Sequence, residues 1–266
     1  MSRFRDATTV EKLAEGRYAA DLDAGYDISG ALNGGYVMAV LLRAAVDADP
    51  VHLHPVATSA AFLRVSKPGP AEITVEVRKT GRTATVSRVT LLQEGRPVVD
   101  AQVTTATLDA DAEPDWAGEA PPPLPPIEQC IGPQPSETDR GFTDRVDMRF
   151  DPATMGWLDG QPSGRLEMRG YFRLRDDDYE PDAYLLAMAV DALPPVVLNT
   201  GALGWAPTVE LTWHMRAVPA PGPISLYGGG RMVREGWFDE EVEAWDSAGR
   251  LVAQCRQIAR VGRKNG

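Results

Sequence analysis

Asp191 is the side chain in this sequence that is best suited to acid–base chemistry. It follows six uninterrupted apolar residues, 185–190, in a segment that we expect to form an enclosed helix. Tyr184, Met188 and Asp191 stand at positions i, i+4 and i+7, so they share one helix face. Burial and the negative end of the helix dipole would both raise the pKa of the carboxyl group, which is typical of a residue that transfers protons. The alternative is a carboxylate that reaches solvent at the helix end.

Gln257 is a polar side chain on the apolar face of a predicted strand, 250–261. An unpaired buried amide costs about 1–3 kcal/mol, so Gln257 needs hydrogen-bond partners. It is therefore either a site residue or a structural amide bonded to the backbone. Alternation places on its face Leu251, Ala253, Cys255, Ala259 and Val261.

Thr208 begins another predicted strand, 207–216, and alternation places it on a face with Glu210, Thr212 and His214. Such a polar face is either exposed to solvent or lines a wet site, and alternation alone does not choose between them.

Gly34 and Gly35 follow Asn33 at the start of a predicted helix, 30–47. The first N–H groups of a helix have no partner within it, and glycine places no side chain in front of them, so these two amides suit an oxyanion or a phosphate. A tight turn without a chemical role is equally consistent with the sequence. The sequence contains no Gly-x-Ser-x-Gly elbow, HExxH motif or P-loop, so serine-triad, zinc and nucleotide chemistries lack their usual signs.

The elements that must position these residues occur twice in the chain. Tyr36 and its apolar run match Tyr184, the strand ending in Arg64 matches the one ending in Arg216, and Gly95 matches Gly249, all in the same order and at nearly the same spacing. At the aligned sites the first copy has Arg43, Val56 and Val103, where the second has Asp191, Thr208 and Gln257. The repeat predicts a scaffold domain at 1–109, a linker rich in proline and acidic residues at 110–140, and a working domain at 141–266.

Each copy contains one apolar helix and a series of strands separated by turn residues, which indicates an α+β unit whose antiparallel sheet wraps the helix. The predicted helices are 30–47 and 181–192. The predicted strands are 54–65, 71–80, 83–94, 97–108, 144–150, 164–174, 207–216, 223–234, 237–246 and 250–261.

Composition excludes several classes of protein. The net charge is −11, which argues against nucleic-acid binding and against a polybasic membrane contact. The two cysteines form no CxxC pattern, the N-terminus has no signal-peptide core, and the apolar runs are too short to span a bilayer. We therefore expect a cytoplasmic protein without a membrane insertion.

The matching segments together resemble the acyl-CoA thioesterase II family, in which two hot-dog domains are fused in one chain. The segments that carry the resemblance are Leu-Asn-Gly-Gly-Tyr at 32–36, Ala-Phe-Leu-Arg at 61–64, the hairpin 88–105, Asp191 ahead of Leu193 and Pro194, Thr-Val-Glu-Leu-Thr at 208–212, and Leu-Val-Ala at 251–253 leading to Gln257. The resemblance implies that Asp191, Thr208 and Gln257 hold the hydrolytic water. The chain departs from the family in the short Ala-Leu-Pro spacer after Asp191, and in Glu210 and Thr212, where better-known members carry Asp and Ser.

The expected activity is hydrolysis of an acyl-CoA thioester to a free acid and coenzyme A, with no metal and no cofactor. Asp191 would activate water, Thr208 and Gln257 would hold it, and an amide of Gly34 or Gly35 would stabilise the oxyanion. The candidates for binding the phosphates of coenzyme A are Arg64, Lys67, Arg78, Lys79 and Arg82.

Two other functions stay open on the same scaffold. They are an enoyl-CoA hydratase or dehydratase, which would need a histidine beside a helix acid, and a non-catalytic protein that binds acyl-CoA or lipid. Pairing of such chains through their sheets, as a homodimer or larger homo-oligomer, is a further expectation from the resemblance.

Overall fold

The computed structural model describes residues 2–132, 141–175, 177–202, 204 and 206–261. The helices are α1 (Arg3–Ala7), α2 (Gly34–Asp47), α3 (Phe142–Arg145) and α4 (Ala183–Ala189), with short 3-10 helices η1 (Ala24–Tyr26), η2 (Ile127–Gln129), η3 (Pro152–Thr154), η4 (Gly156–Asp159) and η5 (Val196–Thr200). The strands are β1 (Glu11–Ala14), β2 (Arg17–Leu22), β3 (Asp27–Ile28), β4 (Ala31–Leu32), β5 (His54–Phe62), β6 (Gly69–Thr80), β7 (Thr85–Gln93), β8 (Arg96–Ala106), β9 (Val146–Phe150), β10 (Glu167–Leu174), β11 (Thr208–Met215), β12 (Ile224–Gly229), β13 (Val233–Arg234), β14 (Trp237–Trp245) and β15 (Leu251–Arg260).

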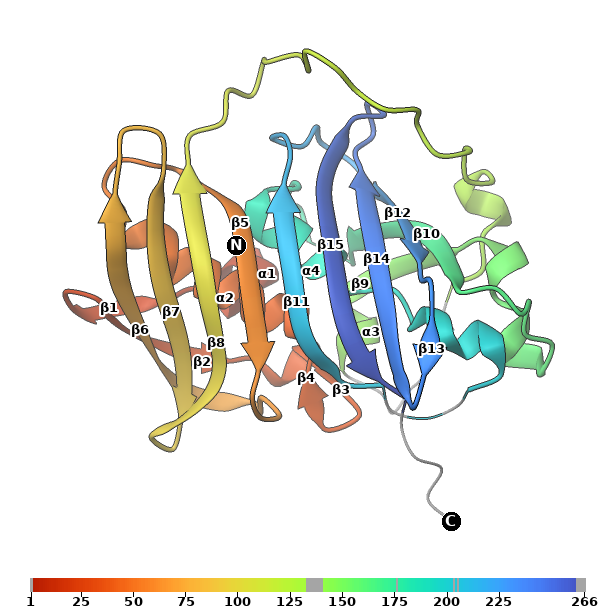
Figure 1. Ribbon diagram of the computed structural model, residues 1–266, viewed down its shortest axis with the longest axis horizontal. Coiled ribbons are helices and arrows are strands. Elements are labelled where there is room, and N and C mark those ends of the chain that lie inside the picture. The colour runs from red at the N-terminus through yellow and green to blue at the C-terminus, as the bar shows by residue number, and fades with distance from the viewer. Residues whose placement is uncertain (1, 133–140, 176, 203, 205, 262–266) are drawn as a thin grey trace.

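The strands of both halves form one continuous antiparallel sheet. Its order within the described residues is β1-β2-β6-β7-β8-β5-β11-β15-β14-β12-β10-β9, with β13 paired to β14 and a separate small pair, β3 and β4. The two halves join where β5 pairs with β11, with Ala60 opposite Leu211. Reading outward from this seam, β5-β8-β7-β6-β2 corresponds to β11-β15-β14-β12-β10, so the duplication seen in the sequence reappears as mirrored strand order. Figure 1 shows the central strands of this sheet, from β6 to β14, in front of α2 and α4.

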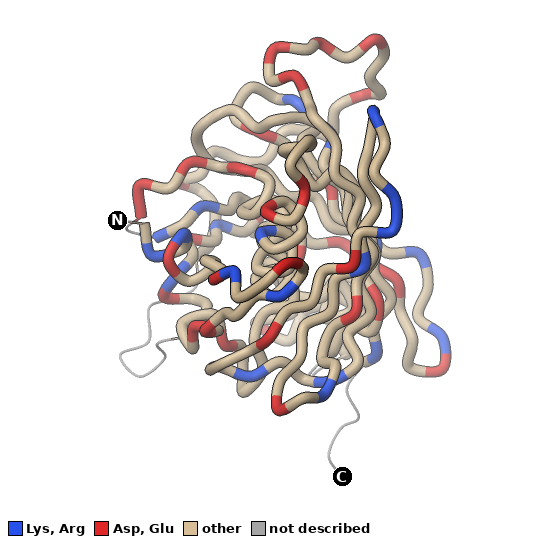
Figure 2. Tube along the Cα trace, turned by 90° about the vertical axis from the view of Figure 1, so that its left-hand side faces the viewer, with Lys and Arg blue, Asp and Glu red and all other residues tan. Residues whose placement is uncertain are grey.

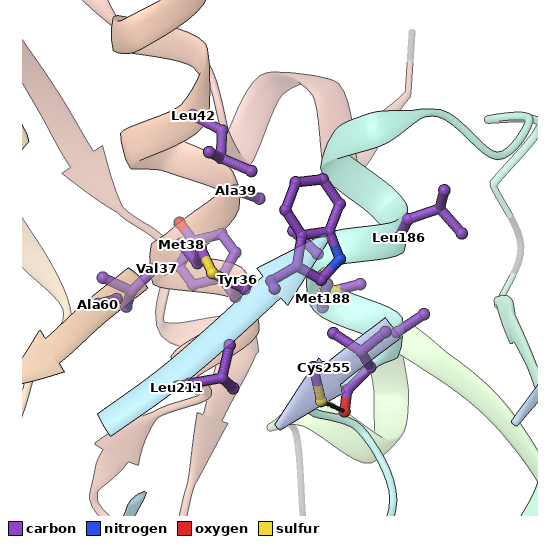
Figure 3. Packing of buried hydrophobic residues seen from close by; sticks show 14 of the residues in the cluster. Tyr36, Val37, Met38, Ala39, Leu42, Ala60, Leu186, Met188, Leu211 and Cys255 are labelled. Atoms are coloured by element: carbon purple, nitrogen blue, oxygen red, sulfur yellow. Dashed lines mark hydrogen bonds between the residues drawn. The ribbon is translucent and has the colours of Figure 1, made fainter. Parts of the chain in front are cut away.

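Helices α2 and α4 lie behind the sheet and form the centre of the core. Residues of α2 such as Tyr36 and Met38 are fully buried, as expected for a helix that is apolar all round. In Figure 3 the side chains of α2 and of α4 converge with Leu211 of β11 and Cys255 of β15, so the core is shared between the halves. The predicted boundaries of the two domains and of the linker stay predictions. Residues 107–126 contain no helix or strand, and residues 133–140 lie outside the described residues.

The second helix is shorter than the predicted 181–192. Asp182 caps its N-terminus, because its carboxylate accepts hydrogen bonds of 2.9 Å from the main-chain N–H groups of Tyr184 and Leu185. The helix ends at Ala189, with Val190 as its C-cap, ahead of Pro194, which a longer helix could not have accommodated. Asp191 therefore lies beyond the last turn of its own helix, and its carboxylate is free to reach another element.

The N-terminal segment adds structure that the sequence analysis did not predict. Strand β2 pairs with β6 and extends the sheet, and α1 places Phe4 in the core against the rings of Tyr26 and Tyr179. The predicted strand 223–234 is divided in the structure into β12 and β13.

Candidate active site

A cavity of about 730 Å³ opens where the two halves meet, at the end of the sheet where β5 ends and β11 begins. Its walls come from the N-terminus of α2, the ends of β5 and β15, the starts of β11 and β14, and the turn after α4. Polar residues on its wall include Asn33, Asp191, Thr208, Glu240 and Gln257. The three catalytic candidates from the sequence, Asp191, Thr208 and Gln257, thus line one cavity.

The carboxylate of Asp191 is held by the N-terminus of α2, in the other half of the chain. Its Oδ2 accepts hydrogen bonds from the Gly35 N–H at 2.8 Å and from Asn33 Nδ2 at 3.2 Å. Asn33 Nδ2 also donates to the Asp191 carbonyl at 2.8 Å, while Asn33 Oδ1 caps α2 by accepting from the Tyr36 N–H at 2.8 Å. The hydrogen bonds from Gly35 and Asn33 to the carboxylate both end on Oδ2.

The pKa of Asp191 reflects two opposed effects. Burial raises it, and hydrogen bonds from the Gly35 and Gly34 amides lower it, with the result that the pKa is about 6. Helix periodicity predicts that this carboxylate faces the negative end of its own helix dipole. In the structure it faces the positive end of α2 instead, so desolvation is the cause of the raised pKa. A carboxyl group with this pKa is ionised at neutral pH and can still accept a proton.

The amides of Gly34 and Gly35 have a different partner from the one the sequence suggested. Because the Gly35 N–H donates to Asp191, it is not free for an oxyanion in this arrangement, and the Gly34 amide also bonds Asp191. Glycine is required here by close packing. A Cβ on Gly35 would lie 2.6 Å from the Ala187 carbonyl oxygen and 2.9 Å from the Asp191 Cβ. The two glycines therefore let the helix end approach the carboxylate and hold it.

Thr208, Gln257 and Glu240 line the same cavity and form a hydrogen-bonded chain. The Thr208 hydroxyl donates to Gln257 Oε1, and Gln257 Nε2 donates to Glu240 Oε1 at 3.3 Å. Glu240 Oε2 accepts from the Val196 N–H at 2.9 Å. The chain thus gives Gln257 a partner at each end of its amide, as a buried amide requires.

A β-bulge decides the direction of Thr208. In the pairing of β11 with β15, Thr208 lies opposite Ala259 and Glu210 opposite Ile258, so one extra residue is inserted at Val209. This insertion turns Thr208 to the inner face, whereas simple alternation put it on the same face as Glu210. Glu210 faces outward, where its carboxylate accepts from Ser59 Oγ at 3.1 Å.

Glu240 was missed by the sequence analysis. It is 2% exposed and lies directly opposite Gln257 in the pairing of β14 with β15. The sequence contains the pattern that would have identified it. Phe238, Glu240 and Val242 alternate on one buried face, just as Gln257 alternates with apolar residues on the last strand. Burial raises the pKa of Glu240 to about 7, helped by the charge of Asp191 and opposed by the bonds from Val196 and Gln257.

The structure separates the five candidates for binding coenzyme A. Arg64 lines the cavity, and Lys67 is exposed one residue after Ser66, which also lines it. Arg78, Lys79 and Arg82 are not brought to the cavity: from Gly69, near the cavity, to Lys79 the strand β6 runs ten residues, or about 33 Å. Arg78 instead pairs with Glu76 at 2.7 Å. Figure 2 shows basic and acidic positions interspersed along the chain rather than gathered on one side.

Among the residues that the structure describes, no group of three His, Cys, Asp or Glu side chains is arranged to hold a metal ion. Within the same residues, none of the helices has the length and apolar composition needed to cross a membrane.

Comparison with known proteins places the chain in a family. Residues 22–106 match the family model for the acyl-CoA thioesterase N-terminal domain, and residues 118–261 match the one for the C-terminal domain. A structure assigned to thioesterase II from Thermobifida fusca YX is 47% identical, with a TM-score of 0.93, and the match covers 99% of this chain and 98% of that one.

More distant relatives agree over nearly the whole chain. An uncharacterized protein of Mycobacterium tuberculosis is 30% identical, over 92% of this chain and 90% of its own length. A protein with a hot-dog fold from Alicyclobacillus acidocaldarius is 20% identical, with a TM-score of 0.86 and 99% coverage of both chains, which shows the fold. The expected α+β hot-dog architecture is thereby confirmed, and the chain belongs to the acyl-CoA thioesterase family.

Proposed function

We propose that the protein hydrolyses an acyl-CoA thioester, with a water molecule held between Asp191 and Thr208 as the nucleophile. The observation that carries the proposal is that two suitable groups line one cavity. The carboxyl group of Asp191 has a pKa of about 6, and the hydroxyl of Thr208 already donates its hydrogen to Gln257. Because the Thr208 hydrogen is used, its oxygen can only accept a hydrogen from the water. Asp191 Oδ1 would accept the other, which turns a lone pair of the water toward the substrate.

The reaction then follows from general acid–base catalysis. The water oxygen forms a bond to the thioester carbonyl carbon as one water proton moves to Asp191. Collapse of the tetrahedral intermediate breaks the C–S bond, releasing the free acid, and the thiolate of coenzyme A takes up a proton from Asp191 or from solvent. The amides of Gly34 and Gly35 act in this scheme by orienting Asp191, and an additional donor to the oxyanion is not assigned to them.

The lining of the cavity supports an apolar acyl group and a polar carrier. Apolar side chains make most of the wall, among them Leu32, Phe62, Leu193, Leu198 and Phe238. Arg64 lines the cavity and is exposed, and Lys67 is exposed close by, so we propose this side for the phosphates of coenzyme A.

The test is release of free thiol from a series of acyl-CoA substrates of increasing chain length. Asp191→Asn should lower kcat by about 10²–10⁴-fold, which is the usual contribution of a general base, while the protein stays folded. Glu210→Gln is the matched control, because Glu210 lies two residues beyond Thr208 on the outward face, and its rate should equal that of the wild type. Binding of acyl-CoA without thiol release would instead favour a non-catalytic binding protein.

A further inference from the structure

We propose that Glu240 is a positioning residue of this site, whose carboxylate fixes the direction of the hydrogen bonds through Gln257 to Thr208. The inference rests on the proposed hydrolysis and adds to it a residue that does not touch the reacting atoms. Its consequence is that a second carboxyl group, besides Asp191, must be ionised for the water to be held correctly.

Glu240 is placed for this role by strand pairing and burial. It lies opposite Gln257, its side chain is 2% exposed, and both of its oxygens accept hydrogen bonds, one from Gln257 Nε2 and one from the Val196 N–H. Buried carboxylates are expensive unless they are paired in this way. The same side chain lines the cavity, so its charge acts on the site itself.

The two ends of the Gln257 amide are not equivalent, because the NH₂ group only donates and the oxygen only accepts. An ionised Glu240 only accepts, so it must face the NH₂ group, which turns the amide oxygen toward Thr208. The Thr208 hydroxyl then donates to that oxygen, as the structure has it, and offers a lone pair to the water.

When Glu240 is protonated, the Gln257 amide is no longer restricted to this one orientation. A carboxylic acid can donate to the amide oxygen, which permits the flipped amide whose NH₂ group donates to Thr208. The Thr208 hydroxyl would then donate its hydrogen to the water and occupy the lone pair needed for attack. Glu240 therefore keeps the hydrogen bonds through Gln257 and Thr208 in the direction that suits attack by the water only while its carboxylate is ionised.

The surroundings of Glu240 bring its titration close to neutral pH. The titratable groups that act on it from the packed elements are Asp191, after α4, and Cys255, on β15. Burial raises the pKa of the Cys255 thiol well above its usual value, so the thiol is neutral. The charge of Asp191 adds to the effect of burial and raises the pKa of Glu240 further.

The test compares Glu240→Gln with Glu241→Gln. Glutamine at 240 has the shape of glutamate but lacks its charge, and its NH₂ group can donate a hydrogen bond to Gln257, as the O–H of the protonated acid can. We expect kcat/KM to fall about tenfold to a hundredfold, as for loss of a charged hydrogen bond. The midpoint of the acidic limb of the pH–rate profile should shift from near the pKa of Glu240, about 7, to near the pKa of Asp191, about 6. Glu241 is one residue along on the exposed face, paired with Arg256 at 3.4 Å, and its variant should match the wild type.

A second measurement is independent of turnover. In NMR spectra of ¹⁵N-labelled protein, the Gln257 side-chain NH₂ signal, identified by its loss in Gln257→Glu, should shift with pH around neutrality. The shift should persist in Asp191→Asn and disappear in Glu240→Gln. If Glu240→Gln does not fold, Glu240→Asp takes its place, and there the signal should titrate with a displaced midpoint.

The two hypotheses fail separately. A Gln257 signal that does not titrate in the wild type, or a pH–rate profile that is the same in Glu240→Gln, would overturn the role of Glu240 and leave hydrolysis standing. Absence of thiol release from any acyl-CoA, with the Gln257 signal still titrating, would overturn hydrolysis and leave the coupling of Glu240 to Gln257.

Discussion

Replacing Gly35 by alanine tests how closely α2 is packed against α4 and Asp191. The added Cβ would lie 2.6 Å from the Ala187 carbonyl oxygen, 2.8 Å from Met188 Cα and 2.9 Å from Asp191 Cβ. Nonbonded carbon atoms are at their optimum at about 3.5–4.0 Å, so the two helices must separate by a sizeable fraction of an ångström. Overpacking of this kind costs about 1–3 kcal/mol. Alanine regains at most about 1 kcal/mol of helix propensity, so the free energy of unfolding should fall by about 1–2 kcal/mol.

Activity should fall as well, because the displaced atoms include the Cβ of Asp191, whose carboxyl group we propose as the general base. A misplacement of about 1 Å can cost about a hundredfold in rate, so a smaller shift should lower kcat by roughly tenfold or more. The assays are urea unfolding followed by tryptophan fluorescence, and thiol release from an acyl-CoA at saturating concentration.

Gly34→Ala is the matched control. A Cβ at that position would meet side-chain atoms that can move, Asp191 Oδ2 at 2.9 Å and the Phe62 ring at 3.1 Å, and no main-chain atom of α4 is among its three nearest contacts. We expect it to lower kcat with little loss of stability. A Gly35→Ala protein as stable and as active as the wild type would refute the reasoning, since the helix contact would then not hold Asp191.

Three further predictions concern the charge and the polar groups of the cavity. The folded state holds the Asp191 proton up to a pKa of about 6, against 3.8 ordinarily, so the contribution of Asp191 to stability should fall by up to about 3 kcal/mol as pH rises from 4 to 7. The raised pKa of Glu240 acts in the same direction, so the wild type should lose stability over this range and Asp191→Asn should lose less, as measured by urea unfolding at each pH. Thr208→Val should lower kcat by about tenfold to a hundredfold, whereas Thr212→Val, on the outward face of the same strand, should leave kcat unchanged. Arg64→Ala should raise KM for acyl-CoA by about twofold to fivefold. Arg78→Ala, at the far end of β6, should leave KM unchanged. If both variants raise KM equally, coenzyme A does not bind at the cavity side that we propose.

Much of the architecture follows from local patterns that are visible in the sequence. The apolar run after Tyr36 predicts a helix buried on all sides, and residues 37–42 of α2 have that burial because each of them is apolar. Alternation on the last strand identifies Gln257 as a polar group on a buried face, and the same reasoning applied to 237–246 would have identified Glu240. The duplication predicts two related halves, which reappear in the mirrored strand order on either side of the seam.

Other features depend on how the halves pack together. Periodicity assigned Asp191 to the last turn of a helix, but the structure ends that helix at Ala189 and directs the carboxylate to amides that lie more than 150 residues earlier in the chain. Alternation could not orient Thr208, because the bulge at Val209 arises only when β11 is paired with β15. The basic residues of the first half look equivalent in sequence, yet the length of β6 carries Arg78 away from the cavity that Arg64 lines.

The sequence by itself thus determined which side chains are polar on buried faces, since the faces of helices and strands follow from periods of 3.6 and 2 residues along the chain. It determined the duplication and, through the matching segments, the family. Only the tertiary structure decided which of these groups meet. Asp191 is held by α2, Gln257 by Glu240, and Thr208 is turned inward by a bulge, because contacts between distant segments depend on how the two halves pack across one sheet.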